Sequence, residues 1–440
     1  KENRFGYFPS FAYAWLASEE KFLKGNDFLS KLKLRLTYGQ TGNERIESFR
    51  YLARLENSFY NGELGLAPGS SQNRELKWEN TTQYNAGLDI GLFKNRVELT
   101  LDYYSKRTND MLLPAYVPGR TGYNTQWQNL GRVDNKGLEI QISSRNIQTK
   151  DFDWQTNFNI SGNRNKVRDI GNIGFIPITM SSGWIQDVGR VTVGQPIGTA
   201  YGYEFDGVYQ LDEFTWQNNS DANIPHDQRL YAIKEGVTKV AGVNVAPGSF
   251  KFKDLNGDGI IDLDNDRTTI SQSAPKFFGG FNNTFRYKNF DLNVFFEGSY
   301  GAEIFNASRY QLEGGVLHTY MNISKDFFHN RWSPTNPTNT YGDFGSFNKT
   351  ATLASSYYVE DASYLRLKNV LLAYRIPDRL AKTIGVGSAR VYVSGSNLIT
   401  WTNYTGFDPE IQSENALLPG FDRLSYPRAK VYTIGLNVGF

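Results

Sequence analysis

The most constraining feature of this 440-residue sequence is a two-residue alternation in its last twelve residues, Ala429 to Phe440. Bulky residues occupy the even positions from Tyr432 to Phe440, and small or polar residues such as Thr433 and Asn437 occupy most of the odd ones. A period of two indicates a strand with one apolar face. The pattern returns about ten times along the chain, with polar or charged residues on the second face each time. This repetition is typical of a β-barrel that stands in lipid around a wet interior.

The charged face of these strands makes the register costly to change. In residues 31–38, Leu34 and Leu36 share one face while Lys33 and Arg35 share the other. A slip by one residue would move a basic side chain such as Arg35 into lipid, at about 2–4 kcal/mol at the membrane midplane. A soluble sandwich shows the same alternation, however, so the alternation alone leaves both architectures open.

Connection lengths favour the barrel, because short and long connections alternate along the chain. Short connections are expected at 93–95, 146–151 and 287–289, and long ones at 43–79, 106–134, 164–276, 302–355 and 402–426. Transmembrane barrels have short periplasmic turns and longer extracellular loops. We therefore predict an all-β, transmembrane antiparallel β-barrel fold of about eleven strands with long extracellular loops.

Composition and strand count refine this prediction. The chain contains no cysteine, which rules out disulfides and thiolate metal sites, and its net charge of +2 gives no reason to expect binding of nucleic acid. If Phe440 lies on the periplasmic side, the loop alternation puts the first residue on the opposite side and makes the number of strands odd. Bacterial barrels have even numbers, so we expect a partial barrel whose first strands lie elsewhere.

Collinear strings across the chain resemble SusC-type TonB-dependent outer-membrane transporters of Bacteroidetes. The strings are LRLTYGQTGN (34–43), LKWENTTQYNAGLDIGLFKNRVELTLDYYSKRTNDMLL (76–113), NLGRVDNKGLEI (129–140), FKDLNGDGIID (252–262), PKFFGGFNNTFRYKNFDLNVFFEGSYG (275–301), NRWSPTNP (330–337), DASYLRLKNVLLAYRIP (361–377), SGSNLITWTNYTGFDPEI (394–411) and YPRAKVYTIGLNVGF (426–440). No string matches the family's N-terminal plug or TonB box.

The resemblance implies that residues 1–440 are the C-terminal part, about 11–13 strands, of a 22-stranded barrel in the bacterial outer membrane, with 164–276 as a long extracellular loop region. It implies active uptake of oligosaccharides or peptides, a SusD-like surface lipoprotein as partner, and coupling to the TonB complex through the missing N-terminal part. It also implies that Phe440 ends a closing strand recognised by the barrel-assembly machinery.

An acidic loop at residues 254–266 is a candidate calcium site. Asp254, Asn256, Asp258, Ile260 (through its carbonyl) and Asp262 stand at positions 1, 3, 5, 7 and 9 of an EF-hand-type loop. Gly259 supplies the turn position, but Asn265 replaces the usual glutamate at position 12, and Asp264 or Asp266 is the alternative ligand there. The alternative is an Asx-rich turn that holds no metal. Bound calcium would be a weak structural ion.

No catalytic residues are expected, and we predict that the chain is not an enzyme. His226, His318 and His329 are far apart in loops, and no G-x-S-x-G, H-E-x-x-H or phosphate-binding-loop string is present. Aromatic residues in the long loops are better candidates for contact with a ligand or lid, because they can stack on sugars or pack against peptide side chains. These residues are Tyr123, Trp127, Trp184, Tyr203, Trp216, Tyr310, Trp332 and Tyr404. Packing within the loops is the alternative role of each, and the string TGFDPE at 405–410 is interpreted as a loop-folding motif.

Two other functions remain open from the sequence. One is a TonB receptor for a siderophore or other small ligand, without a lid. The other is a soluble, calcium-stabilised, β-rich carbohydrate-binding protein or adhesin.

Overall fold

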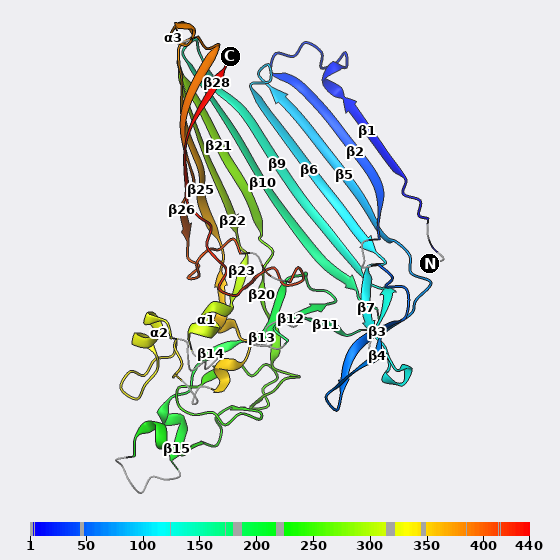
Figure 1. The fold of residues 1–440 in the computed structure, drawn as a ribbon, viewed down its shortest axis with the longest axis vertical. Helices are drawn as coiled ribbons and strands as arrows, with labels where there is room; N and C mark the ends of the chain where they lie inside the picture. The colour runs from blue at the N-terminus through cyan, green and yellow to red at the C-terminus, as the bar shows by residue number, and fades with distance from the viewer. Residues whose placement is uncertain are drawn as a thin grey trace.

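An 11-stranded antiparallel sheet forms the body of the molecule in the computed structural model (Figure 1). Its strands, in spatial order, are β1 (Ser10–Leu16), β2 (Leu29–Asn43), β5 (Glu79–Leu92), β6 (Val97–Asn109), β9 (Arg132–Gln148), β10 (Phe152–Asp169), β21 (Phe277–Tyr287), β22 (Phe290–Tyr300), β25 (Tyr364–Arg375), β26 (Ser388–Thr402) and β28 (Val431–Gly439). Each strand of this wall pairs with the next one along the chain. The structure describes residues 3, 5–44, 48–123, 125–171, 173–178, 187–216, 224–313, 322–344, 349–383, 385–411, 413 and 415–440.

The register of the wall keeps the apolar side chains on one face, as the alternation predicts. Leu34 lies opposite Leu88, Leu88 opposite Leu101, and Leu101 opposite Ile140. The charged residues share the other face, where the Arg35 guanidinium binds the carboxylates of Asp89 at 2.9 Å and Asp102 at 2.8 Å. The wall therefore has an outer face that is apolar over most of its length and a polar inner face.

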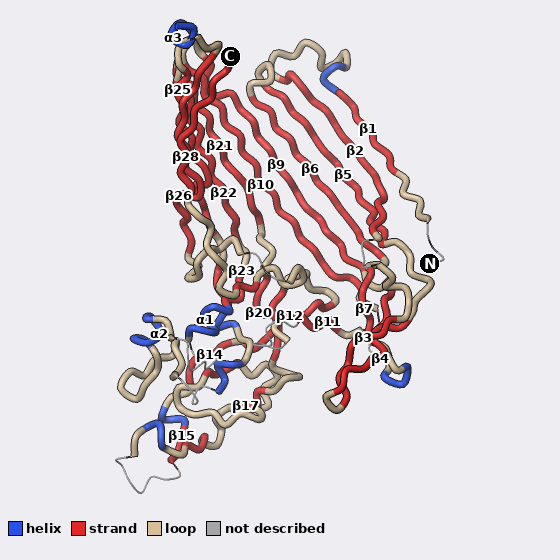
Figure 2. Tube along the Cα trace, in the orientation of Figure 1, coloured by secondary structure: helices blue, strands red, loops and turns tan. Residues whose placement is uncertain are grey.

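Short and long connections alternate along the chain, which confirms the alternation of connection lengths predicted from the sequence. The connections at 93–96, 149–151 and 288–289 meet at one end of the wall, and the long loops gather at the other end (Figure 2). The helix α3 (Asp378–Thr383) lies at the short-turn end, and η1 (Ala17–Glu19) follows β1. No described helix has the length and apolar character needed to cross a membrane.

Three strand ends extend further than the sequence pattern predicts. The intervals 106–134 and 164–276 were expected to be loops, but β6 continues to Asn109, β9 begins at Arg132 and β10 continues to Asp169. The outer positions of these extensions are polar, and the apolar residues Val133 and Val167 lie on the opposite parity in the core of the lobe, so the outer apolar row stops before backbone pairing does.

A bulge explains why the alternation is weak in β25 and β26. Leu367 pairs with Ile399, but the next pair is Asn369 with Ser396, so Lys368 lies opposite two residues of β26. One of these, Asn397, has a φ of +54°. Against β22, Lys368 is itself the extra residue, because Leu367 and Asn369 lie opposite the adjacent residues Phe296 and Phe295. A bulge places consecutive residues on the same face, and this one reverses the parity of the apolar positions halfway along β25.

Three long loops, 170–276, 301–363 and 403–430, pack together into a lobe beyond the wall (Figure 1). Its sheets contain β11 (Phe175–Ile178), β12 (Gly189–Thr192), β13 (Thr199–Tyr203) with β20 (Arg267–Gln272), β14 (Phe205–Val208) with β18 (Phe250–Phe252), β15 (Phe214–Trp216) with β16 (Tyr231–Ile233), β17 (Lys239–Val240) with β19 (Ile260–Ile261), and β23 (Glu303–Asn306) with β24 (Val359–Asp361) and β27 (Phe421–Asp422). Its helices are α1 (Ala307–Leu312) and α2 (Lys325–Asn330). Phe250, Trp332 and Tyr358 are fully buried at its centre, so the lobe has a hydrophobic core of its own.

The remaining long loops form a separate small sheet. It consists of β3 (Arg54–Tyr60), β4 (Glu63–Ser71), β8 (Thr125–Asn129) and β7 (Leu112–Tyr116), with β4 and β8 parallel. Both the lobe and the small sheet lie at the long-loop end of the wall (Figure 1).

Candidate functional site

A buried arginine on the inner face of the wall holds the loop that follows β26. The side chain of Arg366 in β25 is 2% exposed and binds Asp408 at 2.5 Å and Glu410 at 3.0 Å. Its Nε also donates to the Thr400 hydroxyl at 2.9 Å. Because a buried guanidinium is stable only when its charge and donors are matched, these carboxylates fix the loop against the wall.

Two further cations complete this network. Lys368, at the bulge, binds Glu297 at 2.8 Å and Glu410 at 3.4 Å, and Arg428 binds Glu410 at 2.7 Å. Asp408 and Glu410 belong to the TGFDPE string, which was interpreted from the sequence as a loop-folding motif. Their partner Arg366 was not among the site residues predicted from the sequence. The feature that could have identified it is its position among the polar residues of an alternating strand.

A second charged cluster joins the loops within the lobe. Arg309 in α1 binds Glu313 at 2.9 Å and Glu360 at 3.3 Å, and the Tyr357 hydroxyl donates to Glu313 at 2.6 Å. Burial by itself lowers the pKa of Arg309, but the hydrogen bonds and charge of Glu313 outweigh burial and raise that pKa. Glu360 also accepts from Thr405, at 2.8 Å from both its backbone N–H and its hydroxyl. The arrangement of the lobe is therefore set by matched internal charges.

Four of the aromatic candidates lie inside the lobe. Tyr203 is 4% exposed and stacks on Phe252, and Tyr310 is 1% exposed. Trp332 is fully buried and donates from its indole to Gln210 at 3.0 Å. The Tyr404 hydroxyl donates to Asp422, and burial together with this bond raises the pKa of Tyr404. These rings pack the lobe, so a ligand could reach them only if the lobe opened.

Three other candidates are partly exposed. Tyr123 precedes β8, and Trp127 lies in β8 of the small sheet with the Arg50 guanidinium 5.6 Å from its ring centre. Trp216 ends β15 at the far end of the lobe, with the Arg229 guanidinium 3.5 Å from its ring centre. Trp184 lies outside the described residues. Ligand or lid contact by any of the eight stays a prediction.

The acidic loop 254–266 is folded by its own amides. The Asp254 carboxylate accepts from the backbone N–H groups of Gly257 at 2.6 Å and Gly259 at 2.7 Å. Asp266 is fully buried and accepts from the backbones of Leu255 and Asp262, both at 2.8 Å. The Asn265 backbone, then its side chain, holds the pKa of Asp262 below its usual range.

This geometry bears on the calcium hypothesis. The donors are hard oxygens of the kind calcium prefers, but several carboxylates already accept backbone hydrogen bonds. Within the described residues no three acidic or histidine side chains converge as a metal-binding group. Asn256 and Asp258 bind each other at 2.9 Å, and Ile260 donates to Asp258 at 2.8 Å. Calcium binding stays a prediction.

The described histidines do not meet. His226 contacts Tyr231, with 2.6 Å between Nδ1 and the phenol oxygen, and its Nε2 lies 3.7 Å from Asp343. His329 lies in the last turn of α2, beside Phe328. His318 lies outside the described residues.

Known proteins share this architecture. The family model described as TonB dependent receptor-like, beta-barrel matches residues 1–398. The chain belongs to the TonB-dependent receptor family. Its place is the bacterial outer membrane, and its eleven-stranded wall is part of a transmembrane β-barrel. The soluble carbohydrate-binding alternative is thereby overturned.

Curated relatives agree with this assignment. The chain is 38% identical to TonB-dependent receptor P3 of Formosa agariphila, covering 100% of the chain and 42% of the relative. It is 32% identical to TonB-dependent receptor SusC of Bacteroides thetaiotaomicron, covering 100% of the chain and 40% of the relative. The chain therefore spans about two fifths of the length of these TonB-dependent receptors.

A solved structure extends the likeness to three dimensions. The RagAB peptide importer in its closed-closed state superposes with a TM-score of 0.75 at 26% identity, covering 100% of this chain and 44% of that one. The predicted family and fold class of this TonB-dependent receptor are confirmed by these findings.

Proposed function

We propose that this chain is the C-terminal barrel part of an active importer that takes up oligosaccharides or peptides across the outer membrane. Energy would come from the TonB complex through a part of the protein that these residues do not include. A surface lipoprotein would cover the long-loop end, and the 164–276 region would be extracellular. The chain's own contribution is to bind and admit the ligand, which requires no catalytic step.

The observation that carries this proposal is the match of the whole of this chain to about two fifths of TonB-dependent receptor SusC and of a peptide importer. The inner face supports it, because charged networks such as Arg35 with Asp89 and Asp102 suit a wet interior. The lobe supports it as well, because a loop assembly with its own core can present a stable surface to a ligand or lid. Among the candidate rings that lie within the described residues, Trp127 and Trp216 are the partly exposed tryptophans.

Co-purification from the native membrane tests the lid. The complete protein, tagged and extracted in detergent, is expected to bring down a lipoprotein encoded by the same cell in about equal amount. Recovery of the protein alone, in a preparation that still takes up ligand, would favour the siderophore-type receptor without a lid.

Uptake measurements test the substrate class. Cells that lack the complete protein are expected to lose growth on one class of oligosaccharide or peptide, and a TonB-deficient strain is expected to show the same loss. Trp216→Ala is expected to raise the ligand concentration needed for half-maximal growth, because one stacking ring is worth about 0.5–1.5 kcal/mol. Phe328→Ala, an exposed ring on α2, is the matched control. Unchanged growth on all oligosaccharides and peptides would contradict import of either class.

A further inference from the structure

The outer face of the wall changes from apolar to basic near the long-loop end. In register across β6, β9 and β10, Tyr103 lies opposite Leu138, and Leu138 lies opposite Gly162. One step further toward the loops on the same parity, Lys136 lies opposite Arg164. Two residues along a strand span about 6.6 Å, so these cations follow directly on the last apolar row.

Two residues further toward the loops lies a cluster of charged side chains in which cations outnumber carboxylates. Asp134 binds both Arg107 and Arg168 at 2.8 Å. Lys136, Arg164 and Lys166 are exposed, and no ion pair joins them to a carboxylate within the described residues. We call Arg107, Lys136, Arg164, Lys166 and Arg168 the basic patch. All of its members except Arg107 line a hollow of about 490 Å³ that Gly137 and Gly162 also line.

Lys276 marks the boundary of the basic patch. Its side chain lines the same hollow, and its ammonium group lies 5.9 Å from the centre of the Tyr300 ring. Beyond it a different hollow carries Glu303 and Asp361. The surplus positive charge is therefore confined to the β9 and β10 side of Lys276.

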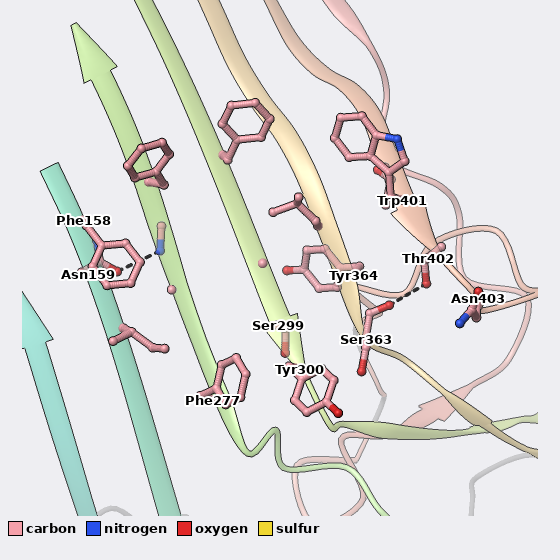
Figure 3. Close-up of a pocket in the computed structure, with 18 residues that line it drawn as sticks. Phe158, Asn159, Phe277, Ser299, Tyr300, Ser363, Tyr364, Trp401, Thr402 and Asn403 are labelled. Atoms are coloured by element: carbon pink, nitrogen blue, oxygen red, sulfur yellow. Dashed lines mark hydrogen bonds between the residues drawn. The ribbon is translucent and has the colours of Figure 1, made fainter. Parts of the chain in front are cut away.

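An apolar groove of about 820 Å³ begins on the membrane side of this boundary (Figure 3). Gly279 and Gly298 pair with each other in its floor and have no side chains to fill it. A Cβ at Gly279 would lie 2.1 Å from the carbonyl oxygen of Asn159, so this close approach of strands requires glycine. The sides include Phe281, Leu365 and Trp401, which are 42%, 48% and 50% exposed.

The groove and the hollow are continuous along the wall. Ile160 lines the groove, and Gly162, two residues further along β10, lines the hollow. Phe277 lines the groove, and its chain neighbour Lys276 lines the hollow. The Phe277 and Tyr300 rings stack at 5.0 Å beside the junction (Figure 3). From loops to membrane the order is cations, aromatic rings, then a bare apolar groove. Lipids present phosphate, interface and hydrocarbon chain in the same order.

We propose that this surface binds one phosphorylated lipid of the surrounding membrane. The basic patch holds the phosphate, with Lys136, Arg164 and Lys166 supplying charge that no protein carboxylate matches, and the groove holds an acyl chain against Gly279 and Gly298. The site faces lipid on the outside of the wall, so it is separate from the route of any imported ligand. Lipid binding at this site requires that the wall stand in a membrane. It does not require any particular imported nutrient.

Lipid titration of the complete protein in detergent, followed by native mass spectrometry, tests the proposal. The probes are phosphatidylglycerol, lipid A, a diacylglycerol of equal chain length, and inorganic phosphate. The variant K136Q/R164Q/K166Q is expected to bind both phosphorylated lipids about 100-fold more weakly, since each of the three basic residues near an anionic surface contributes about a factor of five. The matched control K94Q/K150Q/K288Q removes three cations from the short turns and is expected to bind as the unaltered protein does.

A second variant tests the groove independently. Trp401→Ala is expected to weaken lipid binding severalfold, whereas Tyr13→Ala, an exposed ring on β1, is expected to leave it unchanged. Migration of unheated and heated samples on a denaturing gel checks that each variant is folded. Equal binding by the patch variant and its control, equal binding of diacylglycerol, or displacement of the lipid by equimolar inorganic phosphate would each overturn the proposal.

Discussion

At the scale of single residues, charge matching in the interior decides how the loops dock on the wall. Arg366 is buried between Asp408 and Glu410, and Arg309 is held by Glu313 and Glu360. Removing one member of such a group leaves its partners buried without a counter-charge, which costs more than the intact group contributes. These residues are therefore sensitive points of the loop assembly.

Arg366→Gln is expected to destabilise the docked loop by about 3–5 kcal/mol, because it leaves Asp408 without its main partner. Limited proteolysis of 403–430 in the complete protein measures the effect. Arg379→Gln, in α3 at the short-turn end, is expected to change nothing. R366Q/D408N is expected to recover part of the loss; a double variant as protease-sensitive as the sum of the two single variants would refute the charge pairing.

Calcium binding by the acidic loop is expected to be weak, with a Kd of about 10⁻⁴–10⁻³ M. Isothermal titration of the complete protein should detect it, and Asp258→Asn should weaken it because Asp258 would supply a ligand oxygen. Asp212→Asn, an exposed acid elsewhere in the lobe, is the control. Absence of heat at millimolar calcium would mean that the turn is held by its amides alone.

At the scale of elements, the stability of each strand of the wall depends on whether its apolar face or its polar face meets lipid. In β6 the neighbouring residues Thr100 and Leu101 face opposite sides: Leu101 lies between Leu88 and Ile140, and Thr100 lies opposite Asp89. A charge has opposite consequences at these adjacent positions.

Leu101→Arg is expected to destabilise the folded wall by about 2–4 kcal/mol because it places a cation in lipid. Thr100→Arg is expected to be tolerated, since the new cation faces the inner side near Asp89. Abundance of heat-modifiable protein in the outer membrane distinguishes the two. Equal loss for both variants would argue against the assigned faces.

The bulge in β25 shows where periodicity fails at this scale. Sequence alternation located β2, β5 and β6 with their faces, but it could not place Lys368 opposite two residues of β26. A bulge depends on how two strands meet, and a single strand's pattern does not contain that information. The extended ends of β9 and β10 were missed because their outer positions are polar and their apolar residues, Val133 and Val167, lie on the opposite parity.

At the scale of the whole molecule, the wall and the lobe are held by different interactions. The wall has lipid on one side and a backbone ladder throughout, whereas the lobe buries tyrosines such as Tyr310 and Tyr358 in a small core. Burial raises the pKa of Tyr310 to about 12 and raises that of Tyr358 above its ordinary value.

The lobe is therefore expected to loosen at alkaline pH before the wall does. A tyrosine whose pKa is raised by folding stabilises the fold fully below its unfolded pKa of about 10, and this stabilisation is lost as pH rises toward 12. Proteolysis of 187–216 and 224–276 should increase between pH 10 and 12 while the strand signal in circular dichroism persists. Tyr310→Phe should reduce this pH dependence. Simultaneous loss of both signals would show that the lobe and the wall unfold together.

The sequence by itself determined the antiparallel wall, its two faces, the alternation of connection lengths and the family, because period-two alternation and turn spacing are local properties of a chain in contact with lipid. Only the tertiary structure decided that loops far apart in sequence share one core with Tyr203, Tyr310 and Trp332 packed inside it. It also decided that Tyr404 is buried in a smaller cluster with Ile304 and Ala362, and that Arg366 binds the TGFDPE motif. It also brought the cations of β9 and β10 beside the groove between β21 and β22. Contacts across tens to hundreds of residues depend on how the strands are ordered in space, and no local pattern encodes that order.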